Sequence, residues 1–334
     1  MIKRFLGNEN NFVSGVGIGA MSFTNFYGET NIEESHSVLT EAINQGVNHI
    51  DTSNVYGMGQ SEKVIGSFLK KQGKQKSSFF KIATKASIQR DPMSGKNTFN
   101  NSKEHLREEL LKSLKRLEVD YIDLFYVHRR DPNFQIEEVT ETLLSFIDEG
   151  LIKFFGFSEI APSSLEKAER IGHVGAVQNE YSLSVRSPEL GLLQSTKKNN
   201  TTFVAFSPVG RGLLTDNPPS FQKAQNIQFL KNNPRFRENN LKANIKITEN
   251  FRNLARELGT KSATLAIAWI LHQGNNIITI PGTRSVSHLK ELASGGSLKL
   301  KKTELQEIEK ILSIGWCHGD RYSVDQWIGP EKFC

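Results

Sequence analysis

Eight short apolar runs separated by stretches of helical periodicity constrain the fold of this 334-residue chain more than any other feature. We predict strands over residues 15–20, 48–51, 79–84, 121–128, 153–158, 176–179, 202–207 and 276–280. Between residues 102 and 118, leucines recur at spacings of four, four and three, which places them on one face of a helix. Alternating strands and helices predict an α/β fold, and eight such units predict a closed (β/α)₈ TIM barrel.

Three stretches fall outside the alternation. The first 14 residues are polar and turn-rich, and we predict a hairpin there that closes the floor of the barrel. Residues 214–241 are rich in Asn, Pro and Gln and predict a long loop after the seventh strand. Residues 315–334 form a tail that carries Trp316, Tyr322 and Trp327. The chain shows neither a repeat nor an interdomain linker, so we expect residues 1–334 to form a single domain.

Charge and cysteine content exclude several classes of protein. The net charge of +6 arises from 42 basic and 36 acidic residues that are scattered along the chain. The densest basic run, residues 70–76, has no interleaved aromatic residue, so we expect no nucleic-acid partner. Apolar runs stay short of the roughly 18 residues that a membrane span needs. The two cysteines, Cys317 and Cys334, and the eight histidines lack the spacing of a disulfide framework or a metal site, so we expect a cytoplasmic protein without a metal.

Four chemically capable side chains follow predicted strands: Asp51, Tyr56, Lys85 and His128. The carboxyl ends of the strands are where such a barrel builds its active site. A tyrosine with a pKa near 10 is a poor acid at neutral pH, and we expect the ammonium of Lys85 to lower the pKa of Tyr56. Asp51 would hold Lys85, and His128 would orient a carbonyl oxygen. Each residue alone also has a structural explanation, but the four together indicate catalysis.

Several motifs in the chain resemble those of the aldo-keto reductase family. The segment from Asp51 to Glu62 contains Tyr56-Gly-Met-Gly-Gln-Ser-Glu62, and Thr84-Lys85 and Tyr126-Val-His128 follow downstream. The resemblance implies a (β/α)₈ barrel that reduces carbonyl compounds with a nicotinamide cofactor and without a metal. It also implies that the four residues named above are the catalytic set.

The resemblance further implies a site for NADP (NADPH), with NAD as the alternative. Ser158 and Gln178 would hold the nicotinamide amide, and Phe206 would stack on the ring. Glu159 stands where the family usually has Asn. The pyrophosphate would meet the turn formed by Ser207, Pro208, Gly210, Gly212 and Leu213. The adenosine 2′-phosphate site would comprise Gly282, Thr283, Arg284, His288 and Glu291.

Substrate choice is expected to lie in the loops and the tail. The candidate residues are Phe23, Tyr27, Arg129, Arg130, Trp316, Tyr322 and Trp327. Arg129 and Arg130 follow His128 directly, so one of them is a candidate to bind an anionic group of the substrate. The expected reaction is reduction of an aldehyde or ketone, a class that includes sugars and other polar carbonyl compounds. Two alternatives stay open: a keto-deoxysugar-nucleotide reductase, and a cofactor-binding regulatory subunit resembling potassium-channel β subunits.

Overall fold

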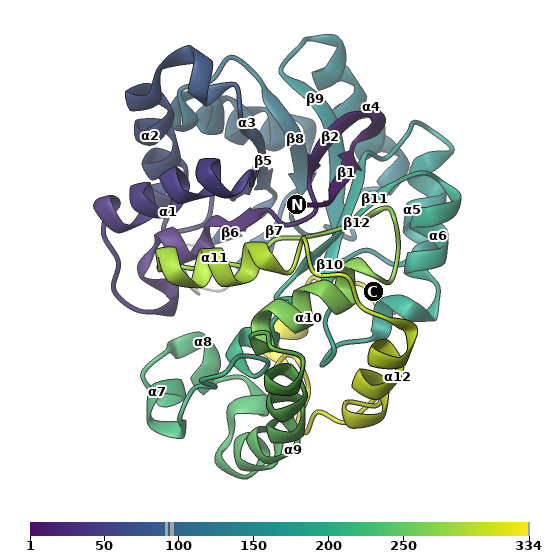
Figure 1. Cartoon of the computed structure of the whole chain (residues 1–334). Helices are drawn as coiled ribbons and strands as arrows, with labels where there is room; N and C mark the ends of the chain where they lie inside the picture. The colour runs from purple at the N-terminus through teal and green to yellow at the C-terminus, as the bar shows by residue number, and fades with distance from the viewer. Residues whose placement is uncertain (91–92, 94–96, 333–334) are drawn as a thin grey trace.

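The computed structural model describes residues 1–90, 93 and 97–332, with only the backbone for residues 74–77 (Figure 1). Eight parallel strands form one sheet in the order β12-β11-β10-β9-β8-β5-β4-β3. Their bounds are β3 Ile18–Gly19, β4 His49–Asp51, β5 Lys81–Ala86, β8 Ile122–Val127, β9 Ile152–Ser158, β10 Ala176–Glu180, β11 Thr202–Phe206 and β12 Ile277–Thr279. The sheet closes because the Gly17 amide donates to the Thr279 carbonyl at 2.7 Å and the Thr279 amide donates to Gly15 at 2.9 Å. The predicted (β/α)₈ barrel is confirmed.

Helices surround the barrel (Figure 1). Those of seven or more residues are α1 Ile32–Gln45, α2 Gln60–Ser77, α3 Lys103–Leu117, α4 Ile136–Asp148, α5 Pro162–Glu169, α6 Leu192–Lys198, α9 Glu238–Glu257, α10 Ser262–Leu271, α11 Val286–Ser294 and α12 Lys302–Ile311. The helix predicted over residues 102–118 is α3. The Ser102 hydroxyl accepts from the His105 amide at its start, and Glu118 ends it in the left-handed conformation.

Successive strand residues point alternately into the barrel and toward the helices, which produces two apolar layers. In β8, Leu124 and Tyr126 belong to the inner cluster, whereas Phe125 and Val127 belong to the outer one. Leu6, from the amino-terminal hairpin, joins the inner cluster. This hairpin, β1 Lys3–Leu6 paired antiparallel with β2 Asn8–Ser14, therefore closes the barrel floor as predicted.

The structure differs from the prediction in three segments. The strand expected over residues 15–20 is only two residues long, because the 3-10 helix η1 begins at Ala20. The stretch expected as a loop, 214–241, contains α7 Phe221–Gln225, α8 Gln228–Lys231, the 3-10 helix η5 Pro234–Phe236 and the start of α9. These elements form because they bury a small core of their own, which includes Leu213, Leu230 and Leu241. A second hairpin, β6 Ile88–Arg90 with β7 Asn97–Phe99, was not predicted.

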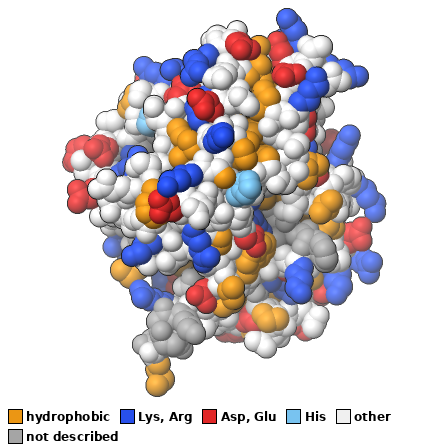
Figure 2. Space-filling model, turned by 90° about the horizontal axis from the view of Figure 1, so that it is seen from below, with side chains coloured by type: hydrophobic (Ala, Val, Ile, Leu, Met, Phe, Trp, Pro, Cys, Tyr) orange, Lys and Arg blue, Asp and Glu red, His pale blue; other side chains and the backbone are white. Residues whose placement is uncertain are grey.

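Figure 2 shows the side of the molecule on which α7, α8 and α9 lie, and basic side chains there alternate with acidic and apolar ones. Across the described residues, helices are too short or too polar to span a bilayer. The same residues contain no group of three or more side chains placed to ligate a metal.

Candidate active site

A left-handed turn after β4 brings Tyr56 to the mouth of the barrel. Gly57, Met58 and Gly59 all have positive φ angles, of 58°, 54° and 85°. A Cβ atom on Gly59 would lie 2.7 Å from the Cδ atom of Arg116, so a larger residue does not fit there. The turn reverses the chain and allows α2 to begin at Gln60. The Gly-Met-Gly sequence is therefore required by the backbone that positions Tyr56.

Lys85 lies beneath this turn in a fully buried polar network. Its ammonium forms an ion pair with the Asp51 carboxylate and donates to the Thr52 carbonyl at 2.7 Å. The Gln178 amide donates to the second oxygen of Asp51, also at 2.7 Å. Burial lowers the pKa of Lys85, although the Asp51 carboxylate acts in the opposite direction. The network ties β4, β5 and β10 together at their carboxyl ends.

Tyr56 lies above Lys85, with the ammonium 5.4 Å from the centre of the phenol ring. Burial raises the pKa of Tyr56, and the Asp51 carboxylate raises it further. The expected lowering of this pKa by Lys85 is not found, because burial and the Asp51 carboxylate prevail; the cation that acts to lower it is Arg129. The phenol therefore keeps its proton at neutral pH, as a proton donor must.

His128 directly follows β8 and faces Tyr56, with the two ring centroids 5.9 Å apart. Its Nδ1 atom shares a hydrogen bond of 3.0 Å with the hydroxyl of Ser53, which leaves Nε2 for another partner. Burial, together with Arg129 and Lys85, holds the pKa of His128 well below its ordinary value. The imidazole is thus neutral at physiological pH. Ser53 was missed in the sequence, although it stands only two residues after Asp51.

The buried histidines predict how stability depends on pH. Burial lowers the pKa of both His128 and His49, so in the unfolded chain these residues take up a proton at a higher pH than in the fold. We expect each to reduce the free energy of unfolding by about 1.4 kcal/mol per pH unit below about pH 6.5. Denaturant unfolding at pH 7.5, 6.5 and 5.5 measures this slope. Slopes in His49→Asn and His128→Asn equal to that of the wild type would contradict the prediction.

The residues expected around the nicotinamide meet at the ends of adjacent strands. Ser158 and Gln178 are paired in register between β9 and β10. Phe206 ends β11 opposite Glu180 and packs against the inner apolar cluster. The Ser158 hydroxyl accepts from the Arg129 guanidinium at 3.1 Å. The strand register brings these side chains to the same end of the barrel as the four catalytic candidates.

The turn after β11 also has a left-handed backbone. Gly210, Arg211 and Gly212 have positive φ angles of 58°, 55° and 95°, and Ser207 has a φ of 51°. The amides of Gly210, Gly212 and Leu213 donate to carbonyls of the turn itself, at 2.9, 3.1 and 3.2 Å. These amides, expected to face a pyrophosphate, are therefore engaged within the turn in this structure. The neighbouring Pro208 is buried.

Hydrogen-bond donors suited to a phosphate gather where β12 leads into α11. Ser285 caps α11, and its hydroxyl lies 2.8 Å from that of Ser287. Thr283 accepts from the Ser285 amide at 3.0 Å, and Arg284 donates to the Glu29 carbonyl across the mouth. The first amides of a helix have no partner within it, so they are additional donors. The other residues expected here are Gly282, which is exposed, His288, which is exposed on α11, and Glu291, whose pKa burial raises.

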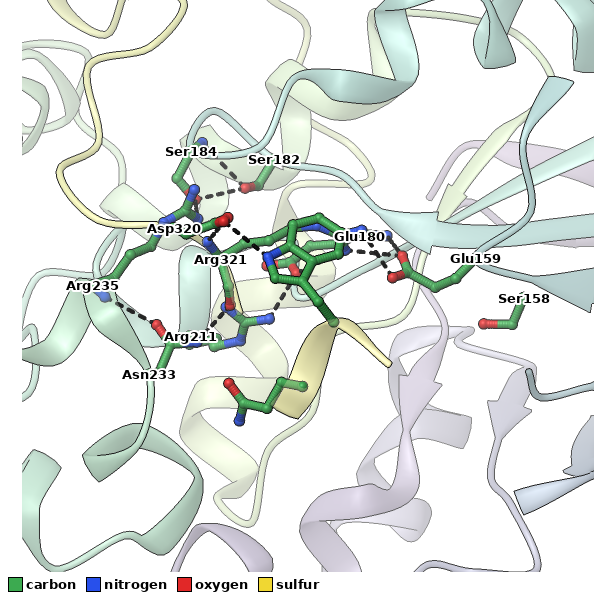
Figure 3. Close-up of polar contacts among 12 residues, drawn as sticks. Ser158, Glu159, Glu180, Ser182, Ser184, Arg211, Asn233, Arg235, Asp320 and Arg321 are labelled. Carbon is green, nitrogen blue, oxygen red and sulfur yellow. Dashed lines mark hydrogen bonds and ion pairs between the residues drawn. The ribbon is translucent and has the colours of Figure 1, made fainter. Parts of the chain in front are cut away.

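Four buried charged side chains that we did not predict lie beside the candidate active site. They are Glu159, Glu180, Arg211 and Arg321, and together we call them the clasp (Figure 3). Arg321 contacts Glu159 at 2.9 Å and Glu180 at 3.4 Å, and Arg211 contacts Glu180 at 2.6 Å. Burial opposes ionisation of Glu159, but Arg321 and Arg129 outweigh it and lower the pKa. The departure from Asn at position 159 was the one sign of the clasp in the sequence.

The clasp fastens the carboxyl-terminal tail over the ends of β9 and β10. The Arg321 carbonyl accepts from Arg211 at 2.9 Å and from the Asn233 amide at 2.5 Å. The Tyr322 and Trp327 rings lie against the Arg321 guanidinium, each with its centroid 4.6 Å away. Cation–π contacts of this kind add to the ion pairs. The tail and the segment after β11 are therefore joined at the mouth.

The remaining substrate candidates divide into two groups. Phe23 and Trp316 lie in the outer apolar core, where the Trp316 indole donates to the Leu183 carbonyl at 2.7 Å. Arg130 is paired with Glu331 of the tail at 3.5 Å. By contrast, Tyr27 lies near the clasp: burial raises its pKa to about 12, and Arg211, Glu180 and Tyr56 all influence it. The substrate candidates that remain at the mouth of the barrel are therefore Tyr27, Tyr322, Trp327 and Arg129.

Two hollows in the described surface lie elsewhere. One, of about 550 Å³, is lined by residues of α10, α12 and their neighbours, including His272 and Glu309. The other, of about 370 Å³, lies beside the amino-terminal hairpin and is lined by Asn residues, Glu9 and His173. Neither contains the chemical groups that gather at the carboxyl ends of the strands, and we assign neither a role.

A family model described as the aldo/keto reductase family matches residues 15–313. The chain is 33% identical over 322 residues to the aldo-keto reductase yakc [NADP(+)] of Schizosaccharomyces pombe, covering 96% of this chain and 94% of that protein. It is 34% identical over 323 residues to the probable aldo-keto reductase 1 of Glycine max, covering 95% and 90% of the two chains.

A solved structure shares the fold. The glycerol dehydrogenase AKR11B4 from Gluconobacter oxydans superposes with a TM-score of 0.81 at 24% identity. The match covers 93% of this chain and 94% of that one.

Proposed function

The chain belongs to the aldo/keto reductase family, and we propose that it is an NADP-preferring oxidoreductase that reduces an aldehyde or ketone to an alcohol with Tyr56 as the proton donor. The proposal rests above all on one observation. Tyr56 and His128 converge over the buried network of Lys85, Asp51 and Gln178.

Each side chain has a distinct task in the proposed reaction. The reduced cofactor, when bound, supplies a hydride to the carbonyl carbon. The Tyr56 hydroxyl gives its proton to the carbonyl oxygen, and the products are an alcohol and the oxidised cofactor. Neutral His128, oriented by Ser53, offers Nε2 as a hydrogen-bond partner for the same oxygen. The ion pair of Lys85 and Asp51 holds the floor of the site in place.

The donor set near α11 supports NADP as the cofactor. A phosphate is bound by cationic groups and hydrogen-bond donors. Such groups are present here as the Arg284 guanidinium, the hydroxyls of Ser285 and Ser287, and the first amides of α11. The name of the Schizosaccharomyces pombe relative specifies NADP(+). Ser158 and Phe206 would hold the nicotinamide end, at the carboxyl ends of β9 and β11.

A substrate screen tests the proposed function directly. Purified protein is mixed with NADPH and a panel of aldehydes, ketones and sugars, and the loss of NADPH absorbance is followed. We expect turnover of at least one carbonyl compound and formation of the matching alcohol. NADPH binding without turnover of any of these compounds would overturn the assignment and would favour a regulatory role.

Cofactor choice is tested at Arg284. A hydrogen bond to a charged group contributes about 1.5–3 kcal/mol, which corresponds to roughly a 10- to 100-fold change in affinity. We therefore expect Arg284→Ala to weaken NADPH binding by roughly that factor and to leave the Kd for NADH nearly unchanged. Lys290→Ala, which removes an exposed cation from α11, the helix that follows Arg284, is the matched control. Equal affinities for NADPH and NADH in the wild type would refute the assignment.

A further inference from the structure

Arg129 lacks a carboxylate partner within the described part of the chain, unlike four other cations near the mouth of the barrel. Among the cations near the mouth, four have a carboxylate partner within 4 Å: Lys85 with Asp51, Arg130 with Glu331, Arg211 with Glu180 and Arg321 with Glu159. Arg129 forms no ion pair with any residue that the structure describes. Among the described residues, Arg129 therefore adds a positive charge beside His128 and Ser158 without a carboxylate that forms an ion pair with it.

The guanidinium of Arg129 is only partly engaged. A single nitrogen, Nη1, donates to the His128 carbonyl at 2.7 Å and to the Ser158 hydroxyl at 3.1 Å. Nε and Nη2 have no acceptor among the described residues, and they do not belong to the polar atoms that are both buried and unpartnered. Because Arg129 is only partly buried, these two nitrogens form the edge of the guanidinium that a ligand can approach. A guanidinium with two free N–H directions matches the paired oxygens of a carboxylate or phosphate.

The position of Arg129 is fixed and close to the reacting groups. The Ser158 and His128 contacts hold one edge of the guanidinium, and a Cβ on Gly329 of the tail would lie 3.1 Å from the Arg129 Cδ atom. Burial raises the pKa of Tyr56 and lowers that of His128, and the charge of Arg129 lowers both. The free edge of Arg129 therefore belongs to the same site as the proton donor.

We propose that Arg129 is a specificity-determining residue that binds an anionic group of the substrate. The preferred substrates are then small aldehydes or ketones with a carboxylate or phosphate a few bonds from the carbonyl group. This inference rests on the proposed function. Its physical basis is that a partly buried guanidinium without a counter-ion gains more from an anionic ligand than from a neutral one. Arg130 is a natural control, because its guanidinium already has Glu331 as a partner.

The test compares an anionic substrate with its neutral analogue. The probes are 4-oxobutanoate and its methyl ester, which differ in charge and share the aldehyde. We expect the wild type to have the higher kcat/KM for the acid, chiefly through KM. Arg129→Met should reduce the acid-to-ester ratio by roughly 10- to 100-fold, the size of one charged hydrogen bond. Arg129→Lys should restore part of it, and Arg130→Met should leave the ratio near that of the wild type.

Direct binding separates this inference from the proposed function. Calorimetric titration of the NADP⁺ complex, which cannot reduce the aldehyde, with 4-oxobutanoate and with the ester gives both affinities independently of turnover. Weaker binding of the acid in Arg129→Met supports the proposal. A wild type that binds acid and ester equally well, or an Arg129→Met variant that loses NADPH affinity in place of selectivity, would overturn it. Lack of turnover with intact selective binding would instead contradict the proposed function alone.

Discussion

Tyr56→Phe is expected to lower kcat for carbonyl reduction by roughly 10²–10⁴-fold, because the substitution removes the proton donor and keeps the ring. The phenol is the group that has both a proton at neutral pH and a place beside His128. The ring's packing over Lys85 does not need the hydroxyl, so the Kd for NADPH should stay within about threefold of the wild-type value. Steady-state kinetics and a fluorescence titration with NADPH measure the two quantities.

Tyr121→Phe is the matched control for this experiment. Tyr121 is 40% exposed and stacks with Lys153, away from the catalytic residues, so kcat should remain at the wild-type value. Turnover of Tyr56→Phe within a factor of about three of the wild type would show that another group donates the proton. In that case His128, despite its low pKa, would be the next residue to replace.

Arg321→Met is expected to reduce the free energy of unfolding by about 3–5 kcal/mol, the usual cost of removing one partner from a buried ion pair. The methionine keeps much of the aliphatic volume, but Glu159 then loses its ion-pair partner and Glu180 retains only Arg211. Urea denaturation followed by circular dichroism measures the change. Substrate selectivity should also change, because the tail loses its attachment to the mouth.

Two further variants determine whether the cost comes from charge. In Glu159→Gln combined with Arg321→Met, one carboxylate is removed together with its partner, so we expect part of the lost stability to return. Arg256→Met removes an exposed arginine from α9 and should change stability by less than about 0.5 kcal/mol. A loss below 1 kcal/mol in Arg321→Met would mean that the clasp contributes little to the fold.

The features that could be predicted from the sequence are those that depend on residues close to one another in the chain. Two such features are the leucine spacing of α3 and the polar residues at the carboxyl ends of β4, β5 and β8. Both depend only on local sequence patterns, and the structure places each of these residues as expected. The segment with α7 and α8 was missed because helices of five and four residues are too short to show a helical period.

The ion pairs of the clasp and the hydrogen bond from Gln178 to Asp51 could not be predicted from local sequence patterns. Gln178 reaches Asp51 across 127 positions of sequence, and Arg321 reaches Glu159 across 162. Such contacts depend on barrel closure and on the path of the tail. The pKa of Tyr56 was likewise expected to be lowered, but it is raised chiefly by burial of the phenol, which depends on the folded structure.

The separation of Arg321 from its partners affects the order of events during synthesis. A chain made at about 5–20 residues per second completes the 162 positions from Glu159 to Arg321 in roughly 8–32 s. During that interval Glu159 lacks its main counter-ion, and Glu180 has only Arg211, which follows 31 positions later. A carboxylate without a partner is costly to bury. The ends of β9 and β10 are therefore expected to stay hydrated on the nascent chain until the last residues emerge, and ribosomes stalled before residue 321 should display a barrel whose mouth is still unsealed.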